Sequence, residues 1–174
     1  MLSYRVARAD DINALRMLME SAISELQKPF LNPDQIAASR AIMGLDTQLI
    51  EDGTYFIIED DGELAGCGGW SRRATLYGND RSQGRDAALL DPAADAARIR
   101  AMYTHPSHIR KGVGRLIISL CEDAARSEQF RTIELMSTMA GEPLYRACGY
   151  SASERVEDDS GGVAVPLIRM TKSL

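Results

Sequence analysis

The chain has 174 residues, of which 45% are hydrophobic and 26% charged, and its formal net charge is −5. This length and composition predict one globular domain over residues 1–174 with a hydrophobic core. The acidic balance excludes a general nucleic-acid surface. No run of about 18 apolar residues would span a membrane and the N-terminus has no apolar signal region, so we expect no membrane partner and a cytoplasmic location.

The three cysteines, Cys67, Cys121 and Cys148, are scattered along the chain. Their number is odd and their spacing matches no common ligand motif. The sequence therefore predicts neither a disulfide framework nor a metal site.

An initial strand and two helices are predicted in the first quarter of the chain. The first helix begins after Asp10, which is a good N-cap residue. The second runs from about Asn32 or Pro33 to Met43 and is less regular.

Two strands and a long connection follow. Thr54–Glu59 and Glu63–Arg73 flank Asp60-Asp61-Gly62, a sequence typical of a hairpin turn. Residues 74–96 show little periodicity, and a connection of that length is usually functional or mobile.

The stretch 97–126 carries the most information. Its first part alternates apolar and polar residues, with Ile99 and Tyr103 on one side, which predicts a strand. After Pro106, an apolar stripe with a period of about 3.6 residues predicts an amphipathic helix. The stripe consists of Val113, Leu116, Ile117, Leu120, Cys121 and Ala124.

A short basic glycine loop joins this strand to this helix. Gly112 and Gly114 allow a ligand to approach the backbone closely. Free backbone N–H groups and the positive end of the helix dipole would meet at that loop, and His108, Arg110 and Lys111 add positive charge. The loop therefore suits a phosphate-bearing ligand.

Two common phosphate loops fit poorly here. The nucleoside-triphosphate loop requires Lys-Ser or Lys-Thr after its glycines, whereas Lys111 precedes them. The dinucleotide fingerprint requires a third glycine where Ile117 stands.

The last quarter predicts a strand, a helix and a closing strand. Ile133 and Leu135 alternate with Glu134 and Met136, after which Gly141-Glu142-Pro143 marks the start of a helix. Val163–Met170 reads as the final strand.

The run THPSHIRKGVGRLI resembles the acetyl-coenzyme A loop of the GNAT superfamily of N-acetyltransferases, Gln/Arg-x-x-Gly-x-Gly/Ala between a strand and a long helix. One position departs, because Ile109 stands where the family has Gln or Arg. A second match lies downstream, where Leu144-Tyr145-Arg146 and Gly149-Tyr150 resemble the family's Phe/Leu-Tyr-x-x-x-Gly-Phe/Tyr.

The resemblance implies an α/β (α+β) fold with a mixed, mostly antiparallel central sheet flanked by helices. The expected order is strand, two helices, three strands, helix, strand, helix, strand. The fourth and fifth strands would be parallel and splayed apart, which admits the pantetheine arm of the cofactor.

The resemblance also implies a site. Tyr145 would be the general acid that protonates the leaving thiolate. Contacts to acetyl-coenzyme A would come from Met102, Tyr103, Thr104, Ile109, Arg110, Lys111, Gly112, Val113, Gly114, Arg115 and Thr138. No metal is expected. The general base stays open among Glu59, Glu63, His105, Glu134 and a chain of water molecules.

The acceptor side is less determined. Trp70 could stack on an acceptor, although core tryptophans are more common, and Arg72, Arg73 and Tyr77 could attract an anionic one. A solvated pair of arginines explains the same residues equally well. These two arginines are the basis for the hypothesis that the acceptor is a small amine that carries a carboxylate or another anionic group.

The predicted function is transfer of an acetyl group from acetyl-coenzyme A to a primary amine of a small molecule or a peptide. The resemblance is also compatible with a homodimer. The alternative is a sensor or subunit that binds acyl-coenzyme A without turnover. A third interpretation, a phosphate-binding regulator of another family, predicts no binding of coenzyme A.

Overall fold

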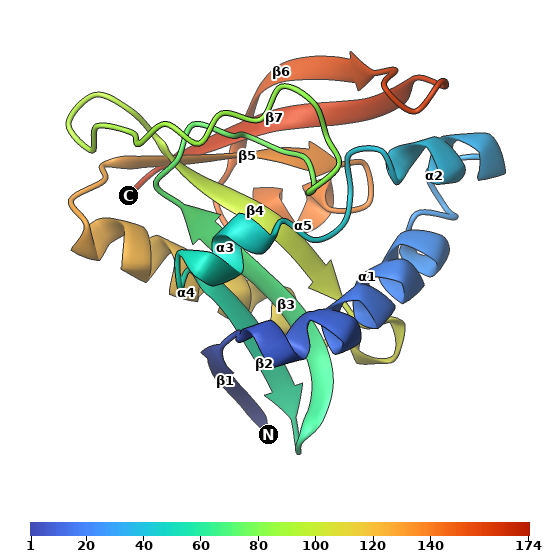
Figure 1. Ribbon diagram of the computed structural model, residues 1–174, viewed down its shortest axis with the longest axis horizontal. Coiled ribbons are helices and arrows are strands. Elements are labelled where there is room, and N and C mark those ends of the chain that lie inside the picture. The colour runs from blue at the N-terminus through green and yellow to red at the C-terminus, as the bar shows by residue number, and fades with distance from the viewer.

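The computed structural model describes all 174 residues and contains one sheet of seven strands in the order β1-β2-β3-β4-β5-β7-β6. The strands are β1 Leu2–Val6, β2 Tyr55–Asp60, β3 Glu63–Ser71, β4 Ala97–Thr104, β5 Thr132–Thr138, β6 Ser151–Asp158 and β7 Val165–Ser173. All neighbours are antiparallel except β4 and β5, which are parallel (Figure 1). This mixed sheet confirms the predicted fold class.

Five α-helices accompany the sheet: α1 Ile12–Leu26, α2 Pro33–Ser39, α3 Thr47–Glu51, α4 Val113–Ser127 and α5 Glu142–Ala147. Short 3-10 turns precede α1 (Ala9–Asp11) and α4 (Pro106–His108). None of the helices combines the length and the apolar character that crossing a membrane requires.

Two elements differ from the prediction. The strand β6 was not predicted, because its side chains are nearly all exposed and show no apolar alternation. The helix α3 was not predicted either, since one and a half turns carry too little periodicity. The second helix is also shorter than expected and ends at Ser39; Asn32 caps its first turn by accepting from the Gln35 N–H at 2.8 Å.

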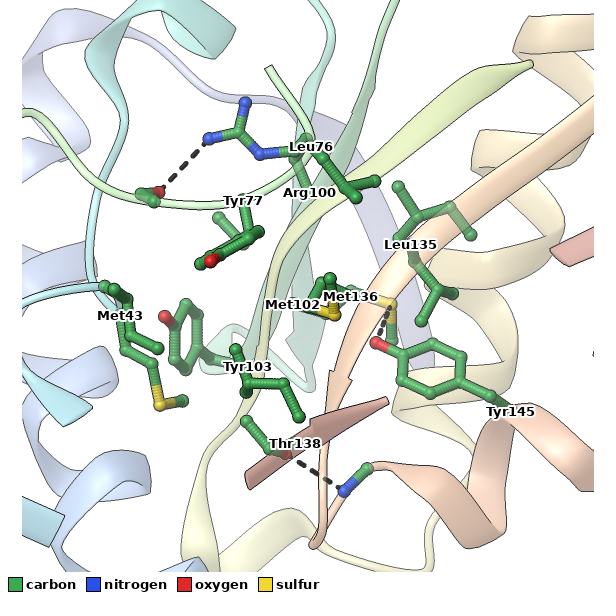
Figure 2. Close-up of a pocket in the computed structure, with 16 residues that line it drawn as sticks. Met43, Leu76, Tyr77, Arg100, Met102, Tyr103, Leu135, Met136, Thr138 and Tyr145 are labelled. Atoms are coloured by element: carbon green, nitrogen blue, oxygen red, sulfur yellow. Dashed lines mark hydrogen bonds between the residues drawn. The ribbon is translucent and has the colours of Figure 1, made fainter. Parts of the chain in front are cut away.

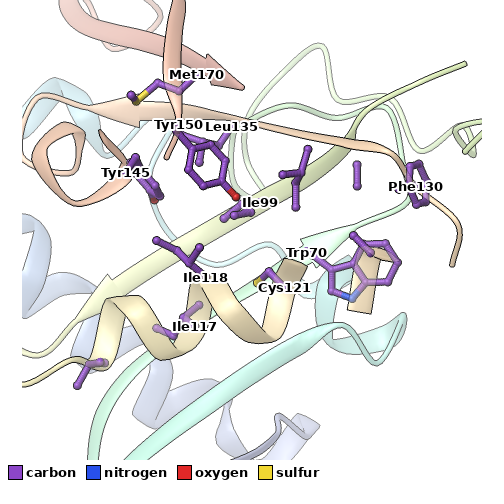
Figure 3. Close-up of a cluster of buried hydrophobic side chains, with 14 of the residues drawn as sticks. Trp70, Ile99, Ile117, Ile118, Cys121, Phe130, Leu135, Tyr145, Tyr150 and Met170 are labelled. Carbon is purple, nitrogen blue, oxygen red and sulfur yellow. The ribbon is translucent and has the colours of Figure 1, made fainter. Parts of the chain in front are cut away.

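The sheet lies between two layers of helices. On one face α4 and α5 cover the largest core cluster, into which Ile117, Cys121 and Tyr145 point together with Trp70 of β3 (Figure 3). On the other face α1 and α3 pack against Tyr55, Ile57 and neighbouring residues, and α2 forms a third cluster with β7. The apolar stripe predicted for 113–124 therefore overlaps the buried face of α4: Val113, Ile117 and Cys121 are buried, and the other three stripe residues are partly buried at its edge.

Residues 74–96 contain no helix or strand beyond one bridge between Arg73 and Leu89. The segment is nevertheless bonded to the helical layer: the Asn79 side chain donates to the carbonyl oxygens of Arg40 at 3.0 Å and Met43 at 2.8 Å. Figure 1 shows it crossing between α3 and the β6–β7 hairpin. We call residues 74–96 the strap.

A buried ion pair joins the strap, α3 and β4. The Arg100 guanidinium donates to the Asp46 carboxylate at 2.9 Å and to the Gly78 carbonyl oxygen at 3.1 Å, and both charged side chains are 3% exposed. Burial lowers the pKa of Arg100 from its usual value, and Asp46 opposes that shift. Removing Asp46 would leave the Arg100 charge without compensation in the interior, whereas Asp46 also binds Arg85 at 2.9 Å.

We expect Asp46→Ala to lower the free energy of unfolding by about 3–5 kcal/mol, since Arg100 would stay buried and unpaired. The matched control is Asp123→Ala, which removes an exposed pair with Arg126 and should cost about 0–1 kcal/mol. Denaturant unfolding of both variants measures the difference. Equal losses would contradict the role assigned to the buried pair.

Candidate functional site

The glycine loop predicted from the sequence connects the end of β4 to α4. Gly112 has a φ of 89° and Arg110 a φ of 64°, both in the left-handed region. Glycine adopts that region without steric cost, and Gly112 is the N-cap residue of α4. The loop therefore turns sharply and presents its backbone to solvent.

The backbone N–H groups of residues 109–115 donate to no acceptor in the protein, and the first bond of the helix is from the Leu116 N–H to the Gly112 carbonyl oxygen at 3.0 Å. Successive free amides at the positive end of a helix dipole form an anion site. The basic side chains are compensated only in part: Lys111 lies 3.8 Å from the Asp60 carboxylate, whereas Arg115 bonds the Cys148 sulfur at 3.8 Å and has no carboxylate partner.

Next to the loop, β4 and β5 part. They pair only at Ala97–Ile133 and Arg98–Glu134, although β4 continues to Thr104 and β5 to Thr138. The splay implied by the family resemblance is thus present.

A bulge in β4 accompanies the splay. Ala101 has a φ of 50°, and the register with β3 shifts between Cys67 and Gly69. The buried Tyr55 hydroxyl donates to the Ala101 carbonyl oxygen at 2.6 Å and so holds the bulge in place. Bulges of this kind redirect backbone groups at active sites.

A pocket of about 120 Å³ opens where the strands diverge (Figure 2). Its lining comes from both faces of the sheet, with Tyr145 and Met102 from the α5 side and Met43 and Tyr77 from the α2 side. Twelve of its 16 lining residues are hydrophobic. The pocket is therefore a mostly apolar passage through the sheet.

Tyr145 stands at this passage on α5. It is 8% exposed, and its hydroxyl contacts only the Met102 sulfur, at 3.5 Å (Figure 2). Burial raises its pKa well above the ordinary value near 10. The hydroxyl thus stays protonated at neutral pH and has no strong acceptor in the protein.

The other expected cofactor residues divide into two groups. Met102, Tyr103 and Thr138 line the pocket, whereas Thr104 lies outside its lining and pairs with Gly66 of β3. The Thr138 hydroxyl accepts from the Gly141 N–H at 3.2 Å, at the start of α5.

Three of the four expected acceptor residues lie away from the pocket. Trp70 is 3% exposed and packs edge-to-face against Phe130 in the α4 core. Arg72 forms a two-point ion pair with Glu128, and Arg73 forms one with Asp52. Trp70 near the end of β3 thus points into the core, and the two arginines that follow the strand are paired with carboxylates.

Tyr77, in the strap, does line the pocket, and its hydroxyl donates to the Asp158 carboxylate at 2.8 Å. Partial burial and this carboxylate raise the pKa of Tyr77 to about 12. Tyr77 is thus a neutral wall of the pocket at neutral pH.

None of the four residues that the sequence left as candidates for the general base lines the pocket. Glu134 is bound by Arg98 and by Arg169, the latter at 2.8 Å, and Glu59 is bound by Arg5 at 3.2 Å. Glu63 is 81% exposed, and His105 bonds Ser107 in its own turn at 2.7 Å.

Sequence analysis missed much of the wall. Ile42, Met43, Met136 and Leu167 line the pocket from segments far apart in the chain. Their apolar character was visible, but only the tertiary fold brings them together. Arg100 also lines the pocket, and its place in an alternating strand carried no signal of that.

Solved structures with the same fold are N-acetyltransferases. A GCN5-related N-acetyltransferase from Rhodopseudomonas palustris has a TM-score of 0.73 at 18% identity, covering 99% of this chain and 95% of that one. The PaiA N-acetyltransferase from Thermoplasma acidophilum, in complex with coenzyme A, has a TM-score of 0.68 at 11% identity, covering 100% and 99%. A putative acetyltransferase, YncA, from Salmonella typhimurium with acetyl-CoA has a TM-score of 0.63 at 19% identity, covering 99% and 94%.

At these identities the structural likeness shows the fold alone. No curated protein matches the sequence. The family model described as the acetyltransferase (GNAT) family matches residues 17–150. That match covers most of the chain and includes the glycine loop, the splayed strands and Tyr145, so the chain belongs to the GNAT acetyltransferase family.

Proposed function

We propose that this protein transfers an acetyl group from acetyl-coenzyme A to a primary amine. The observation that carries the proposal is the row of unpaired backbone N–H groups at residues 109–115, which opens beside a passage lined by Tyr145. A diphosphate would satisfy those amides, and the pantetheine arm would lie between β4 and β5. Ile109 in the Gln/Arg position costs little, because its backbone N–H is retained.

The chemistry at the passage has three parts. The bulge at Ala101–Met102 supplies backbone donors near the thioester oxygen. As the amine nitrogen bonds to the carbonyl carbon, the carbon–sulfur bond breaks, and Tyr145 gives its proton to the departing sulfur. The proton lost by the amine leaves to water, and Tyr145 is reprotonated from water.

The raised pKa of Tyr145 does not defeat this role. A thiolate whose thiol has an ordinary pKa of about 8.5 is a weaker base than the anion of a buried tyrosine, so proton transfer from Tyr145 to it would be unfavourable. The same burial raises the proton affinity of a thiolate formed in the pocket, so both groups shift in the same direction. Thr138 and Tyr103 would position the arm. Metal-free turnover, a cytoplasmic location and a homodimer stay predictions.

The first test concerns the loop. We expect Gly112→Val to weaken acetyl-coenzyme A binding by about tenfold or more, because a β-branched residue resists a φ of 89° and the amides would turn away. Gly53→Val is the control, since Gly53 has a φ of 70° and equally open surroundings. Calorimetric titration should show loss of affinity for the first variant only. Unchanged binding in both would reject the loop as the cofactor site, and no binding by the unaltered protein is what the phosphate-regulator interpretation predicts.

The second test separates an enzyme from a sensor. Tyr145→Phe should lower kcat by about 10²–10⁴-fold, the range of general-acid catalysis, with little change in acetyl-coenzyme A affinity. Tyr150→Phe is the control: its ring lies 5.9 Å from that of Tyr145, but its hydroxyl donates to Glu122, away from the pocket. Thiol release over a panel of amines gives the rate. Tight binding without thiol release from any amine would favour the sensor.

The third test is the pH dependence. Because no carboxylate or imidazole lines the pocket, we expect kcat/KM to follow the fraction of neutral amine, rising about tenfold per pH unit from about pH 6 to 9 for an amine of pKa near 10. The raised pKa of Tyr145 keeps the acid protonated over that range, so no falling limb should appear. A plateau beginning near neutral pH would instead reveal a protein base.

A further inference from the structure

The half of the pocket that faces α2 is apolar. Ile42 and Leu167 belong to the buried cluster beneath α2, and Met43, Met136 and Tyr77 pack against that cluster. All five line the passage, as do Tyr145 and Met102, which belong to the α4–α5 side. With the cofactor entering past the glycine loop, this half is the space left for the acceptor.

The charges near this half are already compensated. Arg100 is the one charged residue in the lining, and its partners are Asp46 and the Gly78 carbonyl oxygen. The Asp158 carboxylate accepts from Tyr77 and from Ser160, and is not part of the lining. The pocket thus offers no free cation to a carboxylate and no free anion to a second ammonium.

This distribution argues against an anionic acceptor. That hypothesis depended on Arg72 and Arg73, which bond Glu128 and Asp52 outside the pocket. A carboxylate placed among methionine and leucine side chains would lose its hydration without gaining a partner. The same surroundings favour the neutral form of an amine, which is the nucleophilic form.

We propose that the acceptor is a monoamine whose body is apolar and uncharged, aliphatic or aromatic, and that the α2 side of the pocket selects it by excluding charge. The inference rests on the proposed acetyl transfer and specifies its substrate class. Methionine side chains adapt to flat rings as well as to branched chains, and their sulfur atoms make favourable contacts with aromatic rings.

The test compares amines that differ only by charge. With acetyl-coenzyme A, 2-phenylethylamine should give a kcat/KM at least about 100-fold above that of phenylalanine, and 3-methylbutylamine should exceed leucine similarly, because a partnerless carboxylate is strongly disfavoured. Phenylalaninamide, which has the bulk without the charge, should recover much of the loss. Equal or better turnover of the amino acids, or a preference for 1,4-diaminobutane, would overturn the inference.

Binding keeps this result distinct from failure of the proposed function. Calorimetric titration of 2-phenylethylamine and phenylalanine into the protein saturated with coenzyme A needs no turnover. Tighter binding of 2-phenylethylamine supports the pocket's selectivity even if no thiol is released. Tighter or equal binding of phenylalanine contradicts that selectivity whatever the catalytic outcome.

A charge introduced into the wall should change the preference. Met136→Arg should shift the kcat/KM ratio of 2-phenylethylamine to phenylalanine toward the amino acid by about tenfold or more, since a guanidinium stays charged in apolar surroundings and supplies the missing partner. Met136→Leu should keep the original ratio. Met17→Arg, at a site on α1 that is 75% exposed, is the control for the added charge. An unchanged ratio in Met136→Arg would argue against acceptor binding at this wall.

Discussion

An ion cluster at the last paired position of β4 and β5 determines where the sheet opens. The Glu134 carboxylate of β5 binds Arg98 of β4 and Arg169 of β7, and the Arg98–Glu134 pair is also the final rung of the parallel ladder. Three strands are therefore fixed together at one level. Beyond it the bulge at Ala101, held by Tyr55, turns β4 away from β5, and the passage exists only because of that divergence.

Polar groups around the passage are mostly satisfied inside the protein, which makes the exceptions informative. Arg100 has Asp46, Tyr77 has Asp158, and Glu134 has two arginines. What stays without a strong partner is the row of amides at 109–115 and the Tyr145 hydroxyl. Apart from the buried Gln27 Oε1, which lies outside the pocket lining, unmet hydrogen-bonding capacity is thus found at two points, where a long ligand with an anionic end and a reactive end would make contact.

The sequence predicted the local parts of this arrangement well and the long-range parts poorly. The stripe of α4 and the turn at Gly112 are set within a few residues, so periodicity and glycine identified both. The burial of Trp70 depends on which face of β3 it occupies, and Gly66, Gly68 and Gly69 obscure the alternation there. The wall formed by Met43, Met136 and Leu167 joins three separate segments, for which a single sequence carries no pairing signal.

The lack of charge in the pocket bears on proton transfer as well as on selectivity. In the proposed reaction, an ammonium that enters the apolar passage loses hydration and gains no carboxylate, so the site would favour the neutral amine without a dedicated base. Near neutral pH an amine of pKa about 10 is neutral in only about one molecule per thousand, which limits the rate at low substrate concentration. A carboxylate in the lining would bind the protonated amine but would also bind the second ammonium of a diamine. In the proposed reaction an apolar wall therefore lowers the rate at neutral pH and increases discrimination against charged acceptors. The pairing of Glu134 with two arginines keeps this β5 carboxylate from binding the protonated amine.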